Sequence, residues 1–445
     1  MSAAPPPDTI FAPATAAGRA GIAVIRVSGA GAAAALAALA GGAGPPRRMT
    51  RAVFRDPESG EALESGLSVF FPGPASFTGE DVAELHIHGG RATVEALCAA
   101  LRRLGLRFAE PGEFARRAFG NGRLDLAEIE GLADLVAAET EAQRRQALRQ
   151  LSGALSALAE GWRACLVRAL AHLEAAIDFA DEDIGDPAAG VAASLAALAG
   201  EIAAHLADGR RGERLRDGVE IAILGPPNAG KSSLLNALAR REAAIVAETA
   251  GTTRDVVEVR LDLGGLPVTV ADTAGLREAA DAVEAEGVRR ALARADAADL
   301  RIVLVDASAP AVPAAAAALI DGTALVVANK TDLATAPPPP TLSGAPVHAL
   351  SLKTGAGLAA LLAAIEERAR ALADDGAGGA PLTRARHRAA LEDCHAALVR
   401  AQGEAEIELR AEDVRLAARA LGRNAGRIDV EDVLDVVFAE LCIGK

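Results

Sequence analysis

A short apolar run that leads directly into a glycine-rich loop is the feature that most constrains this chain. The run VEIAILG is followed by GPPNAGKSSLLNAL, which contains the spacing G-x-x-x-x-G-K-S. A strand, such a loop and a helix in this order form a phosphate-binding loop, because the loop amides and the helix N-terminus face the same point. The pattern predicts that Lys231 reaches the β- and γ-phosphates and that the Ser232 hydroxyl binds Mg²⁺. A chance match is the alternative.

Further motifs in the order and spacing of a GTPase domain exclude the chance match. VADTAG places Asp272 at a strand end, suited to the water shell of Mg²⁺, and Gly275 near the γ-phosphate. AGTTRD lies between the two motifs and offers Thr253 as the second hydroxyl on Mg²⁺. ALVVANKTD ends with Asp332, whose carboxylate only accepts hydrogen bonds. Guanine presents N–H donors at N1 and N2 whereas adenine has an acceptor at N1, so the motif selects GTP.

The segment SLK, residues 351–353, follows a strand and completes the predicted base pocket. The predicted GTP-binding residues are Asn228, Ala229, Gly230, Lys231, Ser232, Ser233, Ala247, Glu248, Thr249, Ala250, Gly251, Thr252, Thr253, Asp272, Thr273, Ala274, Gly275, Asn329, Lys330, Thr331, Asp332, Ser351, Leu352 and Lys353.

The residue that follows DTAG raises a catalytic problem. Many GTPases carry Gln there to orient the attacking water, but this chain has Leu276, which cannot hydrogen-bond water. Another group must orient the water, and the positive charge of an arginine finger must come from elsewhere. The next segment offers Arg277, Glu278, Glu284 and Glu286. From the sequence alone, each Glu is more often a solvated helix residue than a base.

Lysine usage agrees with the motifs. Only four of the 46 basic residues are Lys, and three of these, Lys231, Lys330 and Lys353, fall in the GTPase motifs. The fourth, Lys445, ends the terminal CIGK. A compact ammonium is not interchangeable with a planar guanidinium, so the remaining lysines are candidates for positions that Arg cannot fill.

The whole-chain composition limits the partners and the compartment. A net charge of −14 argues against a general polyanion binder, so any RNA contact would be a local patch. The four scattered cysteines, without C-x-x-C spacing, indicate reduced thiols in a cytosol rather than disulfides or zinc. We find no secretory signal and expect no membrane span, because the Ala-rich runs are too weakly apolar.

Pattern changes along the chain predict a multidomain fold. Strand-like runs at 21–29, 66–73 and 82–90 and a helix at 93–105 indicate an α+β module. Long helical runs follow, and then β-rich runs alternate with helices from residue 218 to about 370, which is typical of a doubly wound, mostly parallel sheet. The predicted domains are an N-terminal α+β domain at 1–122, a helical domain at 123–215, an α/β P-loop GTPase domain at 216–375, and a second helical part with the CIGK tail at 376–445.

Motifs spread over the whole length resemble the bacterial tRNA-modifying GTPase family MnmE (TrmE). They include GRAGIAVIRVSG, FPGPASFTGEDVAELHIHGG, PGEFARRAFGNGRLDLAEIEGLADL, GPPNAGKSSLLNAL, REAAIVAETAGTTRDV, DTAGLREAADAVEAEGV, NKTD and CIGK. The resemblance implies an N-terminal domain that dimerises and binds a folate, a helical domain, and a GTPase domain inserted into that helical domain.

The resemblance also implies how the catalytic problem is solved. Asn228 would coordinate K⁺ beside the phosphates, and the ion would supply the charge of an arginine finger. Further K⁺ ligands would be Ala247, Thr249 and Thr252, mostly through their carbonyls. Glu284 would orient the water, so the implied catalytic residues are Glu284, Asn228, Lys231 and Asp272. The alternative for Asn228 is that it only tolerates a tight turn.

The folate site implied by the resemblance consists of Arg26, Glu84, Arg123 and Lys445, binding 5-formyl- or methylene-tetrahydrofolate. A carboxylate can hold the amino edge of the pterin and cations can meet the glutamate tail. The family often has Lys where this chain has Arg123, which keeps the charge but changes the geometry. For Arg26 and Glu84 the alternative is an ordinary surface pair.

The implied function is a cytoplasmic, homodimeric, K⁺-dependent GTPase without a membrane role. With the FAD-dependent MnmG, in a heterotetramer, it would install aminomethyl or carboxymethylaminomethyl groups at C5 of the wobble uridine of certain tRNAs. RNA contact could involve TRARHR, residues 383–388, or the four-spaced Arg415, Arg419, Arg423 and Arg427, although such spacing is more often a solvated face. The rivals are a ribosome-assembly GTPase, for which no KH-like G-x-x-G module is found, and a folate-handling enzyme regulated by GTP.

Overall fold

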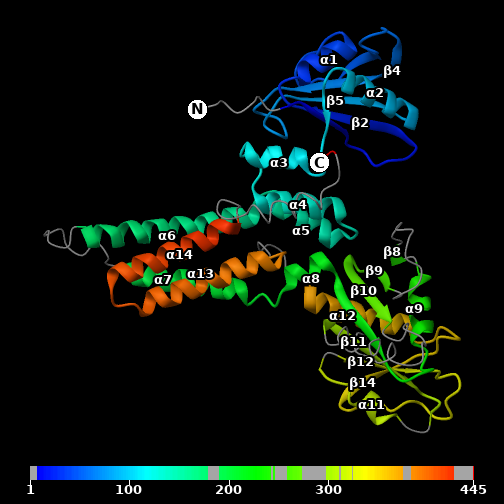
Figure 1. The fold of residues 1–445 in the computed structure, drawn as a ribbon. Coiled ribbons are helices and arrows are strands. Elements are labelled where there is room, and N and C mark those ends of the chain that lie inside the picture. The colour runs from blue at the N-terminus through cyan, green and yellow to red at the C-terminus, as the bar shows by residue number, and fades with distance from the viewer. Residues whose placement is uncertain are drawn as a thin grey trace, which may run out of the picture. The chain divides into compact units, whose positions relative to one another are not determined.

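The computed structural model describes residues 8–178, 190–241, 244–245, 258–272, 297–309, 312–322, 324–373, 382–424 and 444. The chain forms two compact units, Met1–Ala133 with Gly422–Lys445, and Asp134–Leu421. Figure 1 shows the elements of each unit. The first unit therefore combines the N-terminal region with the last residues of the chain.

The first unit is built on a six-stranded sheet with the strand order β3-β4-β5-β2-β1-β6. Neighbouring strands are antiparallel except β1 and β6, which are parallel. The strands are β1 (Ile10–Pro13), β2 (Ala20–Ser28), β3 (Thr50–Arg55), β4 (Ala62–Phe71), β5 (Val82–Gly89) and β6 (Arg107–Phe108). The helices that follow or separate them are α1 (Ala32–Ala40), α2 (Arg91–Arg103), α3 (Glu113–Gly120) and α4 (Leu126–Ala137).

Alternation along β2 explains how this sheet packs. Ala23, Ile25 and Val27 are buried, whereas the residues between them are more exposed. Leucines of α1 and α2 complete the same core: Leu36, Leu39, Leu97 and Leu101. The predicted strands and the helix of this module are confirmed, with ends shifted by at most four residues.

The helical part of the second unit is assembled from segments on both sides of the GTPase domain. Its helices are α5 (Glu141–Leu151), α6 (Ala154–Asp178), α7 (Val191–Leu206), α8 (Arg211–Asp217), α13 (Ala385–Gly403) and α14 (Ile407–Asn424). α13 packs against α7, which also packs against α6. Since α7 precedes the GTPase domain and α13 follows it, that domain is an insertion, as the family resemblance implied.

One helical stretch of the described chain satisfies a simple membrane test. By length and composition alone Val191–Asp217 could span a bilayer, with a mean hydropathy of 1.3. A single stretch of this kind is weak evidence, because core helices pass the same test. Here α7 packs against α6 and α13.

The GTPase part of the second unit contains an eight-stranded sheet with the order β13-β14-β12-β11-β7-β10-β9-β8. The central strands from β14 to β10 are parallel, and β13, β9 and β8 pair antiparallel at the edges. The strands are β7 (Val219–Leu224), β8 (Ala244–Ile245), β9 (Glu258–Leu263), β10 (Leu266–Asp272), β11 (Leu300–Asp306), β12 (Ala324–Asn329), β13 (Thr341–Leu342) and β14 (Ala345–Ala349). The helices are α9 (Lys231–Ala239), α11 (Ala314–Ala317) and α12 (Leu358–Ala373).

This topology confirms the predicted doubly wound, mostly parallel sheet. Every residue of β12 is buried, as expected for a central strand covered on both faces. The carboxyl ends of β7, β11 and β12 lie at one edge of the sheet, because these strands are parallel. Ligands of such folds bind at that edge.

Candidate functional site

The phosphate-binding loop lies between β7 and α9, where the sequence placed it. Gly225 has φ +143°, and a Cβ there would lie 2.1 Å from the carbonyl oxygen of Leu304. Gly230 has φ +104°, and a Cβ there would lie 2.4 Å from Nδ2 of Asn329. Both positions therefore require glycine. Asn228 has φ +62°, a left-handed conformation that Asn tolerates better than most residues.

Lys231 is held inside this loop. Its side chain is largely covered, with the residue 9% exposed. Nζ donates to the carbonyl oxygens of Gly225 at 2.8 Å and Pro226 at 2.9 Å. The ammonium is therefore fixed at the N-terminal end of α9, where the helix dipole also favours an anion. Ser232 and Ser233 are exposed on the first turn of the same helix.

Asn329 links the phosphate loop to the opposite side of the site. It ends β12 and is 3% exposed. Its Nδ2 donates to the carbonyl oxygen of Ala229 at 2.8 Å, and its Oδ1 accepts from the amide of Leu352 at 3.3 Å. One buried side chain thus connects two loops that are far apart in sequence.

Asp332 and Ser351 form the predicted base-recognition end. The Ser351 hydroxyl donates to Oδ1 of Asp332 at 2.7 Å, and Ser351 is 1% exposed. Thr331 anchors the same loop through a hydrogen bond from its hydroxyl to the carbonyl oxygen of Leu350 at 3.0 Å. Asp332 is therefore held by one oxygen while it remains exposed, as an acceptor for two N–H donors must be.

A cavity of about 780 Å³ joins these groups. This volume lies in the usual range for a ligand pocket. The cavity is lined by Pro227, Asn228, Gly230, Lys231, Ser232, Ser233, Asn329, Lys330, Asp332, Leu333, Leu352 and Lys353. The structure therefore brings the motifs that were predicted to bind the phosphates and the base to one site.

Several predicted site residues lie outside the described part of the chain. Asp272 ends β10 opposite Ile223 of β7, and only its backbone is described. The residues outside the described ranges are Ala247, Glu248, Thr249, Ala250, Gly251, Thr252, Thr253, Thr273, Ala274, Gly275, Glu284 and Lys445.

The described ion-binding candidates fit the chemistry that was predicted for them. Ser232 offers a hydroxyl oxygen, the kind of ligand that Mg²⁺ prefers, and it lines the cavity beside Lys231. Asn228 is exposed, lines the same cavity and carries a neutral amide oxygen. Both roles stay predictions.

In the first unit, the structure joins Arg26 and Glu84, two of the predicted folate residues. Arg26 Nε and Nη2 lie 3.0 Å and 2.9 Å from Oε1 of Glu84, and the side chains are 18% and 17% exposed. Arg26 Nη1 donates to the carbonyl oxygen of Gly444 at 3.2 Å. Its guanidinium carbon also lies 5.3 Å and 5.8 Å from the ring centroids of Phe77 and Phe114. The pair is therefore largely covered and specifically packed.

Arg123 lies at the other side of the loop that carries Phe77. An ideal Cβ on Gly79 would lie 3.1 Å from Cγ of Arg123 and 2.9 Å from Cβ of Asn121. The Asn121 amide donates to the carbonyl oxygen of Thr78 at 2.7 Å. The segment Phe77–Gly79 therefore lies in contact with Arg26 at one end and Arg123 at the other.

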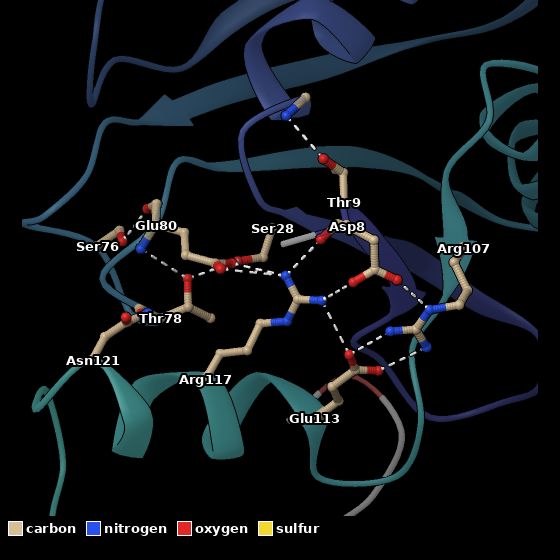
Figure 2. A network of polar contacts seen from close by, with 11 residues as sticks. Asp8, Thr9, Ser28, Ser76, Thr78, Glu80, Arg107, Glu113, Arg117 and Asn121 are labelled. Carbon is tan, nitrogen blue, oxygen red and sulfur yellow. Dashed lines mark hydrogen bonds and ion pairs between the residues drawn. The ribbon is translucent and has the colours of Figure 1, made fainter. Parts of the chain in front are cut away.

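An ionic network that the sequence analysis did not identify anchors this loop (Figure 2). Arg117 donates to Glu80, the next residue after Gly79, at 3.1 Å, to Asp8 at 2.8 Å and to Glu113 at 3.1 Å. Arg107 contacts both oxygens of Glu113, at 2.6 Å and 3.1 Å, and also pairs with Asp8. We call these five residues the N-terminal network.

The N-terminal network perturbs the ionisation of its members. Burial acts to raise the pKa of Glu113, but hydrogen bonds from Arg107 and from the amide of Glu110 outweigh it, so that pKa lies below its ordinary value. The pKa of Asp8 is also lowered, chiefly by its hydrogen bond from Arg107. Both carboxyls are therefore more readily ionised in the folded protein than in the unfolded chain.

Two of the arginines considered for RNA contact are used in internal ion pairs, and Arg427 lies outside the described residues. Arg388 is 9% exposed and donates to Asp208 at 2.6 Å and Glu213 at 2.9 Å. Arg384 pairs with Asp134 at 2.9 Å. These two arginines of TRARHR point into the protein and join segments on either side of the GTPase domain. The local sequence alone could not reveal these contacts.

This chain is similar over nearly its whole length to known proteins of about the same length. Residues 9–123 match the family described as "GTP-binding protein TrmE N-terminus", and residues 126–442 match "MnmE helical domain". A protein of Parvibaculum lavamentivorans named "tRNA modification GTPase MnmE" is 61% identical over 447 residues, covering 98% of this chain and 100% of that protein. One of the same name from Paramagnetospirillum magneticum is 59% identical over 445 residues, with 98% and 100% covered.

The chain is also similar to a solved structure. The G domain of the T. maritima FeoB iron transporter is 28% identical, covers 34% of this chain and 98% of that domain, and gives a TM-score of 0.27. At that score the similarity adds nothing to the assignment.

Proposed function

Because this chain belongs to the MnmE (TrmE) family of tRNA modification GTPases, we propose that it couples GTP hydrolysis to the modification of the wobble uridine of certain tRNAs. The chain and its relatives match end to end, so the whole architecture is shared and not the GTPase domain alone. The proposal concerns the one-carbon folate that the GTPase uses, the ions that it needs and the partners with which it acts.

The observation that carries the nucleotide part is the pairing of two motifs across one cavity. Lys231 lies at the phosphate end, and Asp332, held by Ser351, lies at the base end. GTP would be oriented by these groups, with Mg²⁺ held by Ser232 and Thr253. Bound Mg²⁺ and K⁺ would neutralise charge that develops on the phosphates. K⁺ would be held by Asn228 together with Ala247, Thr249 and Thr252. Glu284 would orient the attacking water, which Leu276 cannot do.

The first unit supports the folate part of the proposal. The Glu84 carboxylate contacts Arg26 through Oε1, and His86 Nε2 lies 3.3 Å from Oε2. An acceptor-only carboxylate retains lone pairs beyond these contacts, so it can still receive the amino edge of a pterin. Arg123 and Lys445 would bind the acidic tail of a one-carbon tetrahydrofolate, in its 5-formyl or methylene form.

The proposed assembly is a cytoplasmic homodimer that acts on tRNA with the FAD-dependent MnmG in a heterotetramer. Hydrolysis would open and close paired GTPase domains and so gate the transfer of an aminomethyl or carboxymethylaminomethyl group to C5 of the uridine. The family similarity supports this, since the two relatives described above carry the name of a tRNA modification GTPase.

Mass spectrometry of tRNA nucleosides tests the proposal. Cells that lack the gene should lose C5-modified wobble uridines, and the intact gene but not Asp272→Ala should restore them. An unchanged nucleoside profile would reject the proposal and favour a ribosome-assembly GTPase. Folate binding with unaltered tRNA would favour a folate-handling enzyme that GTP regulates.

The proposed K⁺ role predicts a selective ion effect. GTP turnover should be faster in K⁺ than in Na⁺, and Asn228→Ala should remove the difference while it leaves GDP binding in place. Equal rates in the two salts for the unmodified chain would show that Asn228 only accommodates the turn.

A further inference from the structure

Asp306 is a charged residue beside the nucleotide cavity that has no part in the proposed mechanism. It ends β11 at the same sheet edge as the site, directly opposite Asn329 of β12. Its side chain is 23% exposed and it does not line the cavity. A partly buried carboxylate at this position needs an explanation in terms of what it holds.

The carboxylate of Asp306 holds Lys330. Oδ2 of Asp306 lies 2.6 Å from Nζ of Lys330, whose side chain is 30% exposed and lines the cavity. Lys330 also has φ +65°, in the left-handed region. A non-glycine residue in this region carries some backbone strain, so the surrounding contacts must fix it there.

Asp306 is itself fixed in place. Its Oδ1 accepts hydrogen bonds from the backbone amide of Ser308 at 2.9 Å and from the Ser308 hydroxyl at 2.6 Å. The carboxylate therefore has one oxygen for a local turn and the other for Lys330. Burial acts to raise the pKa of Asp306, but the hydrogen bonds from Lys330 and Ser308 outweigh it, so the carboxyl stays ionised.

This arrangement has a consequence for ligand binding. A free lysine side chain has four rotatable bonds and loses entropy when a ligand orders it. Because the ammonium is already anchored, the side chain of Lys330 is ordered before a ligand enters the cavity that it lines together with Asp332, the residue proposed to recognise the base. The side-chain entropy of Lys330 is then lost when the protein folds and not when the ligand binds, which strengthens the affinity for the ligand.

We propose that Asp306 is a positioning residue for the guanine nucleotide, which anchors the Lys330 ammonium so that the lysine stem is preorganised against the base. This inference rests on the proposed nucleotide site. It assigns Asp306 no contact with the reacting atoms, so it predicts an effect on affinity without an effect on the chemical step. Because GDP and GTP share the base, both should be affected equally.

Equilibrium binding of fluorescent GDP and a non-hydrolysable GTP analogue to the full chain tests the inference. Asp306→Asn should weaken both about 3-fold to 10-fold, as expected for a partly exposed ion pair that orders a side chain. The turnover number at saturating GTP should be unchanged. In a Lys330→Met background, which keeps the stem but lacks the ammonium, Asp306→Asn should have no further effect.

Asp321→Asn is the matched control. It removes the same charge from an ion pair of the same sheet, with Arg301 at 2.8 Å. Arg301 lies near the start of β11, at the opposite end of the strand from Asp306. The control should therefore leave the affinity for both nucleotides unchanged.

Three results would overturn the inference: unchanged affinity in Asp306→Asn, an equal loss in the Lys330→Met background, or an altered turnover number. If Asp306→Asn does not fold, Lys330→Met breaks the same pair from the other side, and unchanged GDP affinity in that variant also overturns it. Failure of the nucleotide site itself is recognised separately, because Asp332→Ala would then leave GDP affinity unchanged as well.

Discussion

The N-terminal network and the nucleotide site use polar contacts in opposite ways. In the network, Arg117 contacts three carboxylates and Arg107 contacts two of the same three, so the two arginines share partners (Figure 2). In the nucleotide site the contacts are divided among several side chains that share no partner, such as Asn329, which contacts Ala229 and Leu352, and Ser351, which contacts Asp332. The first arrangement makes many contacts depend on one residue, while the second divides them.

This difference indicates different physical tasks. A shared, partly buried network fixes the relative positions of the chain segments that supply it, here the segment before β1, the loop before β5, β6 and α3. Its loss would leave the largely covered carboxylates of Glu80 and Glu113 short of partners. Separate contacts between loops can each be adjusted when a ligand enters, so their loss should alter binding more than folding.

The largest effect should come from Arg117→Met, which breaks the network at its centre. The Arg117 side chain is 12% exposed, and those of Glu113 and Glu80 are 11% and 15% exposed. Removing one partner from buried charges of this kind costs about 2–4 kcal/mol of unfolding free energy. Hydrogen exchange of the α3 amides in the full chain should show this loss, while GDP affinity stays unchanged.

Arg91→Met is the control for that experiment, since Arg91 pairs with Glu95 but its side chain is 91% exposed. It should not alter exchange in α3. A similar loss of protection in both variants would mean that the network has no special role.

Asn329→Ala should have the reverse outcome. It leaves the carbonyl of Ala229 and the amide of Leu352 without their partner and separates the two loops of the cavity. We expect GDP binding to weaken about 10-fold to 100-fold, the usual cost of unsatisfied buried groups. Exchange in α3 should not change.

Asn121→Ala makes the same chemical change in the other region, where the Asn121 amide donates to the carbonyl of Thr78. It should loosen the Phe77–Gly79 loop and leave GDP binding intact. If either asparagine variant altered both readouts, the two regions could not be treated as separate.

Lowering the pH should destabilise the N-terminal network. The pKa of Glu113 is lowered from 4.5 and that of Asp8 from 3.8 in the folded protein. Such carboxyls stabilise the fold above their unfolded-state pKa values, and this contribution is lost as the pH falls through the folded values. Stability of the first unit should therefore decline below about pH 4.5, and more gently in Arg117→Met. A steeper decline in that variant would assign the acid response to other groups.

The arrangement of the proposed nucleotide site follows from the sequence because its motifs are short and local. The loop from Gly225 to Gly230 needs glycines where other backbone and side-chain atoms approach, and Asp332 follows its strand within three residues. Local spacing sets the order of these groups along the chain. The parallel sheet then brings the strand ends together, which the alternating pattern also predicted.

Contacts between distant segments were not predictable in the same way. Arg26 reaches Gly444, 418 residues away, and Arg117 reaches Asp8, 109 residues away. Nothing in the local sequence distinguishes these arginines from solvated ones, and Arg384 and Arg388 were considered for a basic surface for that reason. Asp306 left a weak signal, since it ends a strand beside the one that carries Asn329.

The smallest effect should come from Arg144→Ala in α5. This variant tests whether the burial of polar contacts, and not their number, determines what they contribute to stability. Arg144 makes hydrogen bonds of 2.8 Å and 2.7 Å to Glu141, but the side chains are 49% and 55% exposed. Solvent screens such a pair, so the melting temperature should not change measurably. Thr140→Ala in the same helix removes a buried N-cap that accepts from Gln143, and should cost about 1 kcal/mol. If Arg144→Ala proved as costly as Thr140→Ala, exposure would not decide the value of a polar contact here, and the contrast between the network and the nucleotide site would need another basis.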